Sequence, residues 1–224
     1  MTKGEKITII VFSTFYLSIF IIEFLLYIFK IKFPKLNLKK VLFINLILLL
    51  LGFFGILILS NTNYLDYEKP IPYSEYKRIG FKNFRGLEFF KKEFNGSKYF
   101  AYVVTTIELD KKNNTIEAYF HPSKSFVYNK KSSSTDLLVH ELYHFKITEF
   151  FARKTRKEII EKKNINFEDK EKILNANLIE EDDFQKKYDY ETYHSYVYSK
   201  QKEFERRIDS LLLTLENYKN PKLK

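Results

Sequence analysis

Residues 140 to 144 read His-Glu-Leu-Tyr-His, an HExxH pattern in which two potential metal ligands enclose a potential base. On an α-helix, side chains four positions apart lie on one face, about 6 Å apart along the axis. His140 and His144 can therefore each direct a ring nitrogen at one ion, with Glu141 beside it. A zinc ion held by two neutral imidazoles and a third ligand keeps one position for water and lowers the pKa of that water toward about 7. The pattern predicts a zinc-activated water with Glu141 as general base.

A catalytic zinc site needs a third protein ligand. His194 is the leading candidate, because it continues a helical stripe that would face the core. The stripe comprises His194, Val197, Gln201, Phe204, Ile208, Leu211 and Leu215. A core histidine bonded to a backbone carbonyl is the alternative interpretation of His194. The carboxylates that stay open as ligands in its place are Glu180, Glu181, Asp189 and Glu191. Glu149 should point to the opposite side of the helix, and His121, which precedes a proline in a loop, should face solvent.

The motif should lie on a helix that runs from Thr135 to about Lys157. This stretch contains no Gly or Pro, its apolar residues recur at helical spacing, and suitable N-cap residues precede it: Ser133, Ser134 and Thr135. Upstream, residues 99–109 and 115–120 are rich in β-branched and aromatic types and enclose the turn sequence DKKNN, which predicts a hairpin. Downstream, one or two short helices and a long last helix are expected. Strands followed by helices indicate an α+β domain.

The first sixty residues contain two apolar stretches, about 7–29 and 41–59, each long enough to cross a bilayer as a helix. They predict two transmembrane helices within residues 1–60, a linker at 61–75 and a folded domain at 76–224. The lysine-rich loop KIKFPKLNLKK between them should be cytoplasmic by the positive-inside rule. The chain is then expected to be a two-span protein of the cell membrane, in contact with the lipid bilayer, with its domain extracytoplasmic.

A carboxylate interrupts the first apolar stretch at Glu23, and an amide interrupts the second at Asn45. The two lie at similar distances from the connecting loop, so they are expected to hydrogen-bond across the helical pair. Two helices offer little room for an ion path. We therefore interpret Glu23 as a helix-pairing residue.

The composition excludes several classes of protein. The chain has no Cys, which rules out a disulfide scaffold, a Cys-based zinc finger and thiol catalysis. Lys and Arg number 38 against 28 Asp and Glu, but the two signs alternate along the domain. No clustered basic stripe with spaced aromatic residues is present, so nucleic acid is not expected as a partner.

Three segments, in order, resemble the domain of unknown function 922 family, bacterial proteins regarded as zincin-type peptidases. DLLVHELYHFKITEFFARKTRK is similar to the family's L-x-HE-x-x-HF-x-I-x-E-x-x-AR, YDYETYHSYVYSKQKEFERRI to its YD-x-E-T-x-H and following helix, and FKNFRG at 81–86 to its opening DF-x-G. The resemblance covers most of residues 78–215. It departs at Asn83, where the family usually has Asp, and at Phe126, where it tends to have Trp.

The resemblance implies a zincin-like core, with a small antiparallel sheet packed on the HExxH helix. It carries the metal and base roles to His140, Glu141 and His144, and makes the stretch around His194 part of the site. By analogy with zincins, residues 115–121 should form the strand that pairs with an extended substrate. The candidates for stabilising the oxyanion are Tyr193, Tyr196 and Arg153, all of which have packing as their alternative role.

These observations predict a membrane-anchored, zinc-dependent metallopeptidase that acts on a protein or peptide. Its ligands would be His140, His144 and His194, with Glu141 as general base. The alternative is a tethered, non-catalytic binding module in which the metal is structural or absent. Closed coordination by four protein ligands would favour that alternative, because no water could then be activated.

Overall fold

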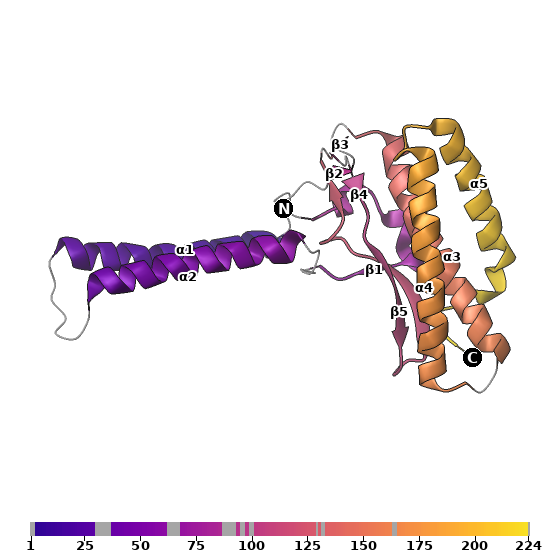
Figure 1. Cartoon of the computed structure of the whole chain (residues 1–224), viewed down its shortest axis with the longest axis horizontal. Coiled ribbons are helices and arrows are strands. Elements are labelled where there is room, and N and C mark those ends of the chain that lie inside the picture. Colours follow the sequence, from indigo (N-terminus) through magenta and orange to yellow (C-terminus); the bar gives the residue numbers. More distant parts are fainter. Residues whose placement is uncertain are drawn as a thin grey trace. The chain divides into compact units, whose positions relative to one another are not determined.

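The computed structural model describes residues 3–29, 37–61, 68–86, 93–94, 97–98, 101–128, 130, 133–162 and 165–223. The chain divides into two compact units, Met1–Tyr67 and Glu68–Lys224 (Figure 1). All of the residues with metal-site chemistry belong to the second unit.

The first unit is a pair of helices, α1 (Lys3–Ile28) and α2 (Leu38–Asn61), which pack on each other. The amide of Asn45 donates to Glu23 Oε1, and Glu23 is buried. The predicted pairing of these two residues is therefore confirmed. The lysine-rich loop was used to predict which end of the helical pair faces the cytoplasm. Its lysines at 30, 32 and 35 lie outside the described residues.

Among the residues that the structure describes, we find no helix that is both long and apolar enough to cross a membrane. This finding contradicts the predicted transmembrane hairpin. It equally contradicts the predicted location of the chain as a two-span protein of the cell membrane.

The second unit contains a three-stranded antiparallel sheet in the order β1-β6-β5, formed by Ile71–Pro72, Thr115–Phe120 and Thr105–Asp110. The predicted hairpin is confirmed as β5 and β6, with Ile107 opposite Ala118. The residues before β5 belong instead to a short pair, β4 (Ala101–Tyr102) with β7 (Phe126–Val127). A further pair joins β2 (Glu93–Phe94) to β3 (Ser97–Lys98). Short 3-10 helices η1, η2 and η3 occupy Tyr73–Arg78, Phe81–Asn83 and Glu216–Tyr218.

Three helices follow the strands: α3 (Thr135–Lys162), α4 (Phe167–Thr192) and α5 (Tyr198–Thr214). The predicted cap of α3 is confirmed, because Ser134 Oγ accepts from the backbone N–H of Leu137 at 3.1 Å. Asn166 caps α4 in the same way, accepting from Asp169 N at 2.8 Å. Without Gly or Pro between these ends, α4 runs unbroken for 26 residues, where short helices were expected.

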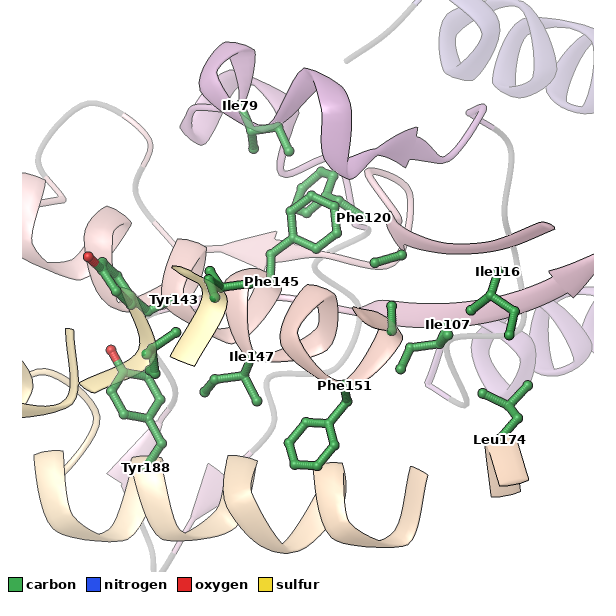
Figure 2. Close-up of a cluster of buried hydrophobic side chains, with 14 of the residues drawn as sticks. Ile79, Ile107, Ile116, Phe120, Tyr143, Phe145, Ile147, Phe151, Leu174 and Tyr188 are labelled. Carbon is green, nitrogen blue, oxygen red and sulfur yellow. The ribbon is translucent and has the colours of Figure 1, made fainter. Parts of the chain in front are cut away.

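Helix α3 lies against the sheet on one side and against α4 and α5 on the other (Figure 1). Alternate residues of β6 are buried in the core, and the last of them is Phe120. The ring centroid of Phe120 lies 6.2 Å from that of Phe145 of α3 (Figure 2). On the far side of α3, Phe151 packs on Phe184 of α4. The predicted α+β domain with a small antiparallel sheet is thus observed, and its core fixes how α3 is rotated.

The chain makes a tight turn between α4 and α5, so His194 is not part of the last helix. Tyr193, His194 and Ser195 have φ angles of 46°, 51° and 76°, in the left-handed region that side-chain-bearing residues seldom adopt. The predicted stripe therefore begins only at Gln201, and the expectation that α5 includes His194 is wrong. Helical periodicity in the sequence does not reveal a break made without Gly or Pro.

The FRG segment at 84–86 is held against the loop that follows β6. Gly86 N donates to Ser125 O at 2.8 Å, and a Cβ at Gly86 would lie 2.9 Å from that oxygen, so only glycine fits. The buried Ser125 hydroxyl donates to His121 O and accepts from Val104 N. His121 itself is buried, with Nε2 2.8 Å from Thr106 Oγ1, so the expectation that it faces solvent is wrong.

Candidate metal centre

The two histidines of the HExxH pattern converge as the helical spacing predicts. His140 and His144 are 1% and 9% exposed, and their Nε2 atoms lie 3.3 Å apart. The ring planes are nearly perpendicular, at 87°. Glu141, which is also buried, projects from the same stretch of α3.

A carboxylate from α4 completes the cluster. Asp189 Oδ1 lies 3.1 Å from His140 Nε2 and 2.9 Å from His144 Nε2. The ligand atoms of these three residues are all within 4.8 Å of one another. Two imidazoles and one carboxylate form a donor set that zinc accepts, and such a set leaves a fourth position for water. These residues would therefore fit a metal ion.

His194 lies beside this group without belonging to it. Its Nδ1 is 3.4 Å from Asp189 Oδ1, and its ring centroid is 6.4 Å from that of His140. The turn between α4 and α5, not a helical stripe, brings it there. Its role as a metal ligand stays a prediction, while Asp189, an alternative in the sequence argument, occupies the position next to both histidines.

The other carboxylates considered as ligands are not part of the group of three. Glu180 is exposed and accepts from Lys154 Nζ at 2.5 Å, and Glu191 lies 3.6 Å from Lys187 Nζ. Glu181 is buried and accepts from Thr148 Oγ1 at 2.6 Å. Glu149 faces the other side of α3, as expected, and accepts from Arg153 and Arg156.

A cavity of about 380 Å³ opens beside the cluster. One wall is the backbone segment 101–105, and the others come from α3, α4 and the turn after α4. The residues that line it on the helical side are Glu141, His144, Leu178, Glu181, Asp182, Gln185, Asp189 and His194. A substrate in this cavity would meet both the ligand group and Glu141.

Burial raises the pKa of Glu141 to about 7, because the carboxylate is desolvated. The positive charge of His144 and the backbone N–H of Val103, which donates to the carboxylate, partly offset this effect. A carboxylate that titrates near neutral pH can both accept and return a proton under ordinary conditions. This property suits a general base.

The two histidines differ in protonation. Burial lowers the pKa of His140 to about 4. Burial acts in the same direction on His144, but the Asp189 carboxylate outweighs it and raises the pKa of His144 to about 9. Burial alone would raise the pKa of Asp189, yet His144 and the hydrogen bonds from the histidines hold it far below its usual range. Without metal, at neutral pH, His144 is therefore the positively charged imidazolium and pairs with the Asp189 carboxylate, while His140 is neutral.

Tyr188 of α4 orients His140 by stacking. Their ring centroids are 4.6 Å apart with an interplanar angle of 19°, and Tyr188 is fully buried. Among the described residues, His140 Nδ1 is buried without a hydrogen-bond partner. Packing, rather than a hydrogen bond, therefore fixes this ring.

None of the three residues considered for the oxyanion lines the cavity. Arg153 lies on the other side of α3, where it donates to Glu149 and to Leu212 O. Tyr193 and Tyr196 are 61% and 64% exposed on the turn after α4, where their ring centroids lie 6.1 Å apart.

The strand expected to bind a substrate is at the wrong place in the sheet. β6 lies between β5 and β1, and its far end is covered by the C-terminal segment, where Ile116 N donates to Pro221 O. Neither edge of β6 can therefore accept an added strand. In the described part of the sheet, β5 is one of the two outer strands, and its first residue, Thr105, lines the cavity.

Comparison of the chain with known protein families, with curated proteins and with solved structures finds no match in any of the three. The resemblance to the domain of unknown function 922 family therefore rests on its motifs alone.

Proposed function

We propose that this protein is a zinc-dependent metallopeptidase, with Glu141 as general base. The observation that supports it best is the meeting of His140, His144 and Asp189 beside a cavity that His144, Asp189 and Glu141 line. A catalytic site requires a partly open ligand set and a base beside it, and both are present in this arrangement. The motif resemblance to zincin-type peptidases points in the same direction.

In this proposal, His140 and His144 offer Nε2 to the ion and Asp189 offers a carboxylate oxygen. When bound, zinc would polarise a substrate carbonyl and acidify a water molecule. Glu141 accepts the proton of that water and returns it to the leaving amine, a role that its pKa near 7 permits at neutral pH. Helices α3 and α4 bury both imidazoles, and Asp189 is partly exposed.

Peptides are proposed as substrates because an extended backbone can lie along the cavity wall. Segment 101–105 forms that wall and leads directly into β5, whose outer edge is unpaired in the described part of the sheet. Such an edge offers backbone hydrogen bonds to an added strand. The proposed substrate strand is thus moved from residues 115–121 to β5.

A second candidate function is a binding module with a structural metal. The position of His194, 3.4 Å from Asp189 Oδ1, favours it, because a fourth protein ligand would close the coordination shell. The two functions predict different zinc environments. X-ray absorption spectroscopy of the zinc-loaded chain separates them: three protein ligands and an exchangeable oxygen fit the peptidase, and four protein ligands fit the module.

The full chain tests the proposed function directly. It should bind about one zinc per molecule by metal analysis and cleave members of a random peptide library. Glu141→Gln should retain the zinc and lower kcat/KM by about a thousandfold or more, because the base is lost. Glu180→Gln, which changes an exposed carboxylate of α4, is the matched control and should keep full activity. A folded chain without zinc, or hydrolysis unaffected by Glu141→Gln, would refute the peptidase.

A further inference from the structure

We propose that Gln185 of α4 is a positioning residue that fixes the ring of the metal ligand His144. This inference deepens the proposed function and depends on its metal site. His144 Nδ1 lies 2.5 Å from Gln185 Oε1, on the side of the ring away from Asp189. An oxygen acceptor at Nδ1 keeps a proton on that nitrogen and leaves Nε2 as the ligand atom.

The surrounding contacts determine which end of the amide faces the ring. Gln185 Nε2 lies 3.0 Å from His144 O, a carbonyl that can only accept a hydrogen bond. The NH₂ group must therefore point to the helix backbone, and Oε1 must face Nδ1. A single glutamine thus holds both the ring and the backbone of residue 144.

A partly buried chain of polar groups holds Gln185 in turn. Thr148 Oγ1 accepts a hydrogen bond from Gln185 Nε2 at 3.3 Å and donates one to Glu181 Oε1 at 2.6 Å. Thr105 Oγ1, at the start of β5, lies 2.7 Å from the same threonine oxygen. This series of hydrogen bonds runs from Thr105 at the cavity wall, through Thr148 of α3 and Gln185 of α4, to His144. The strand proposed to bind the substrate and the metal ligand His144 are therefore held by the same hydrogen bonds.

The two histidine ligands differ in how they are oriented. His140 stacks on Tyr188, and its Nδ1 has no hydrogen-bond partner among the described residues. In His144, by contrast, the second ring nitrogen, Nδ1, meets an acceptor in a partly buried network. Loss of the amide should therefore disturb His144 selectively.

The test is zinc affinity of the full chain, measured with a chelating competitor, together with ¹⁵N NMR of the histidines in the zinc-loaded state. Gln185→Leu removes the acceptor with little change in size and should weaken zinc binding 10- to 100-fold. Gln185→Glu returns an oxygen acceptor and should recover at least tenfold of that loss. In the wild type, His144 should carry its proton on Nδ1; in Gln185→Leu the NMR signature of that proton should change.

Gln201→Leu is the matched control, because Gln201 is a buried glutamine of α5 that donates to Asp136 O and Glu205, outside the site. It should leave zinc affinity unchanged. Equal zinc affinity in Gln185→Leu and wild type, or an equal loss in Gln201→Leu, overturns the positioning role. Zinc binding without peptide hydrolysis overturns the proposed function alone, and a wild-type chain that binds no zinc overturns both.

Discussion

Helix α3 carries two buried polar clusters, and they are built on opposite plans. Toward α4, His140 and His144 share the single carboxylate of Asp189. On the other side of the helix, Glu149 accepts from both Arg153 and Arg156. The guanidinium of Arg156 also donates to Ala152 O and Lys219 O, so its charge and its donors are matched.

The difference indicates which cluster has a ligand to bind. In the Glu149 cluster, buried charges of opposite sign satisfy one another and tie α3 to the C-terminal segment, as a structural network does. In the His140 cluster, atoms with lone pairs are brought together. Hydrogen bonds from the histidines to Asp189 and the extra proton of His144 relieve their repulsion. A cation would replace that proton. Buried polar groups by themselves therefore do not indicate a metal site. Several lone pairs that point at one position do indicate one.

The largest expected effect contrasts the two clusters directly. Glu149→Ala leaves the buried guanidinium of Arg156 without its carboxylate, while Arg153 keeps Glu216. It should lower the free energy of unfolding by about 3–5 kcal/mol, with zinc affinity of the folded chain unchanged. His144→Ala should do the reverse: zinc affinity should fall by about a thousandfold, with a smaller loss of metal-free stability. Urea unfolding in chelator and competitive zinc titration measure both. Loss of zinc affinity in Glu149→Ala would show that the two clusters do not act independently.

The next effect ranks the donors within the metal cluster. Asp189→Ala should weaken zinc binding by about 100-fold or more, because it removes the carboxylate next to both histidines. His194→Ala should have a smaller effect, since His194 lies outside the group of three. Equal losses in the two variants, measured by the same competitive titration, would indicate four ligands and favour the structural metal.

Zinc binding should release protons from this cluster. At pH 8, His144 is protonated because its pKa is raised to about 9, whereas His140, with a pKa near 4, is neutral. Zinc requires neutral imidazoles, so about one proton should leave, and affinity should rise roughly tenfold per pH unit up to about pH 9. Calorimetry in buffers of different ionisation enthalpy counts that proton. A count of zero at pH 8 would contradict the protonation of His144.

The smallest effect concerns backbone strain in the left-handed turn between α4 and α5, beside the metal cluster. Ser195 has φ of 76°, so Ser195→Gly should stabilise the chain by about 0.5–1 kcal/mol. Ser210→Gly, at an exposed position inside α5, is the control and should destabilise it by about 0.5 kcal/mol. Thermal unfolding compares them. Destabilisation by Ser195→Gly would show that its hydroxyl contributes more than its backbone strain costs.

Much of the local structure could be predicted. The cap at Ser134, the long helix after it and the hairpin of β5 and β6 follow from nearest-neighbour patterns, and they are confirmed. The predictions that fail depend on distant packing. His121 was expected in solvent because it precedes a proline in a loop, but Thr106 and Ser125 bury it. β6 was expected at an edge, but a strand before it and the segment after α5 cover it.

The membrane prediction was based on hydropathy alone, from the two apolar stretches at about 7–29 and 41–59. Among the described residues, no helix is both long and apolar enough to cross a membrane, although the helices and the bond from Asn45 to Glu23 form as expected. Hydropathy correctly indicated two paired helices there. It did not establish what surrounds them.

The sequence by itself determined that His140, Glu141 and His144 share one stretch of α3, because the spacing of side chains on a helix is a local property of the backbone. Only the tertiary structure decided which distant group meets them. Asp189 does so because α4 packs along α3 as one unbroken helix, and His194 comes near because a left-handed turn reverses the chain after it. Contacts of this kind depend on how two elements pack, and no periodicity within either element encodes that choice.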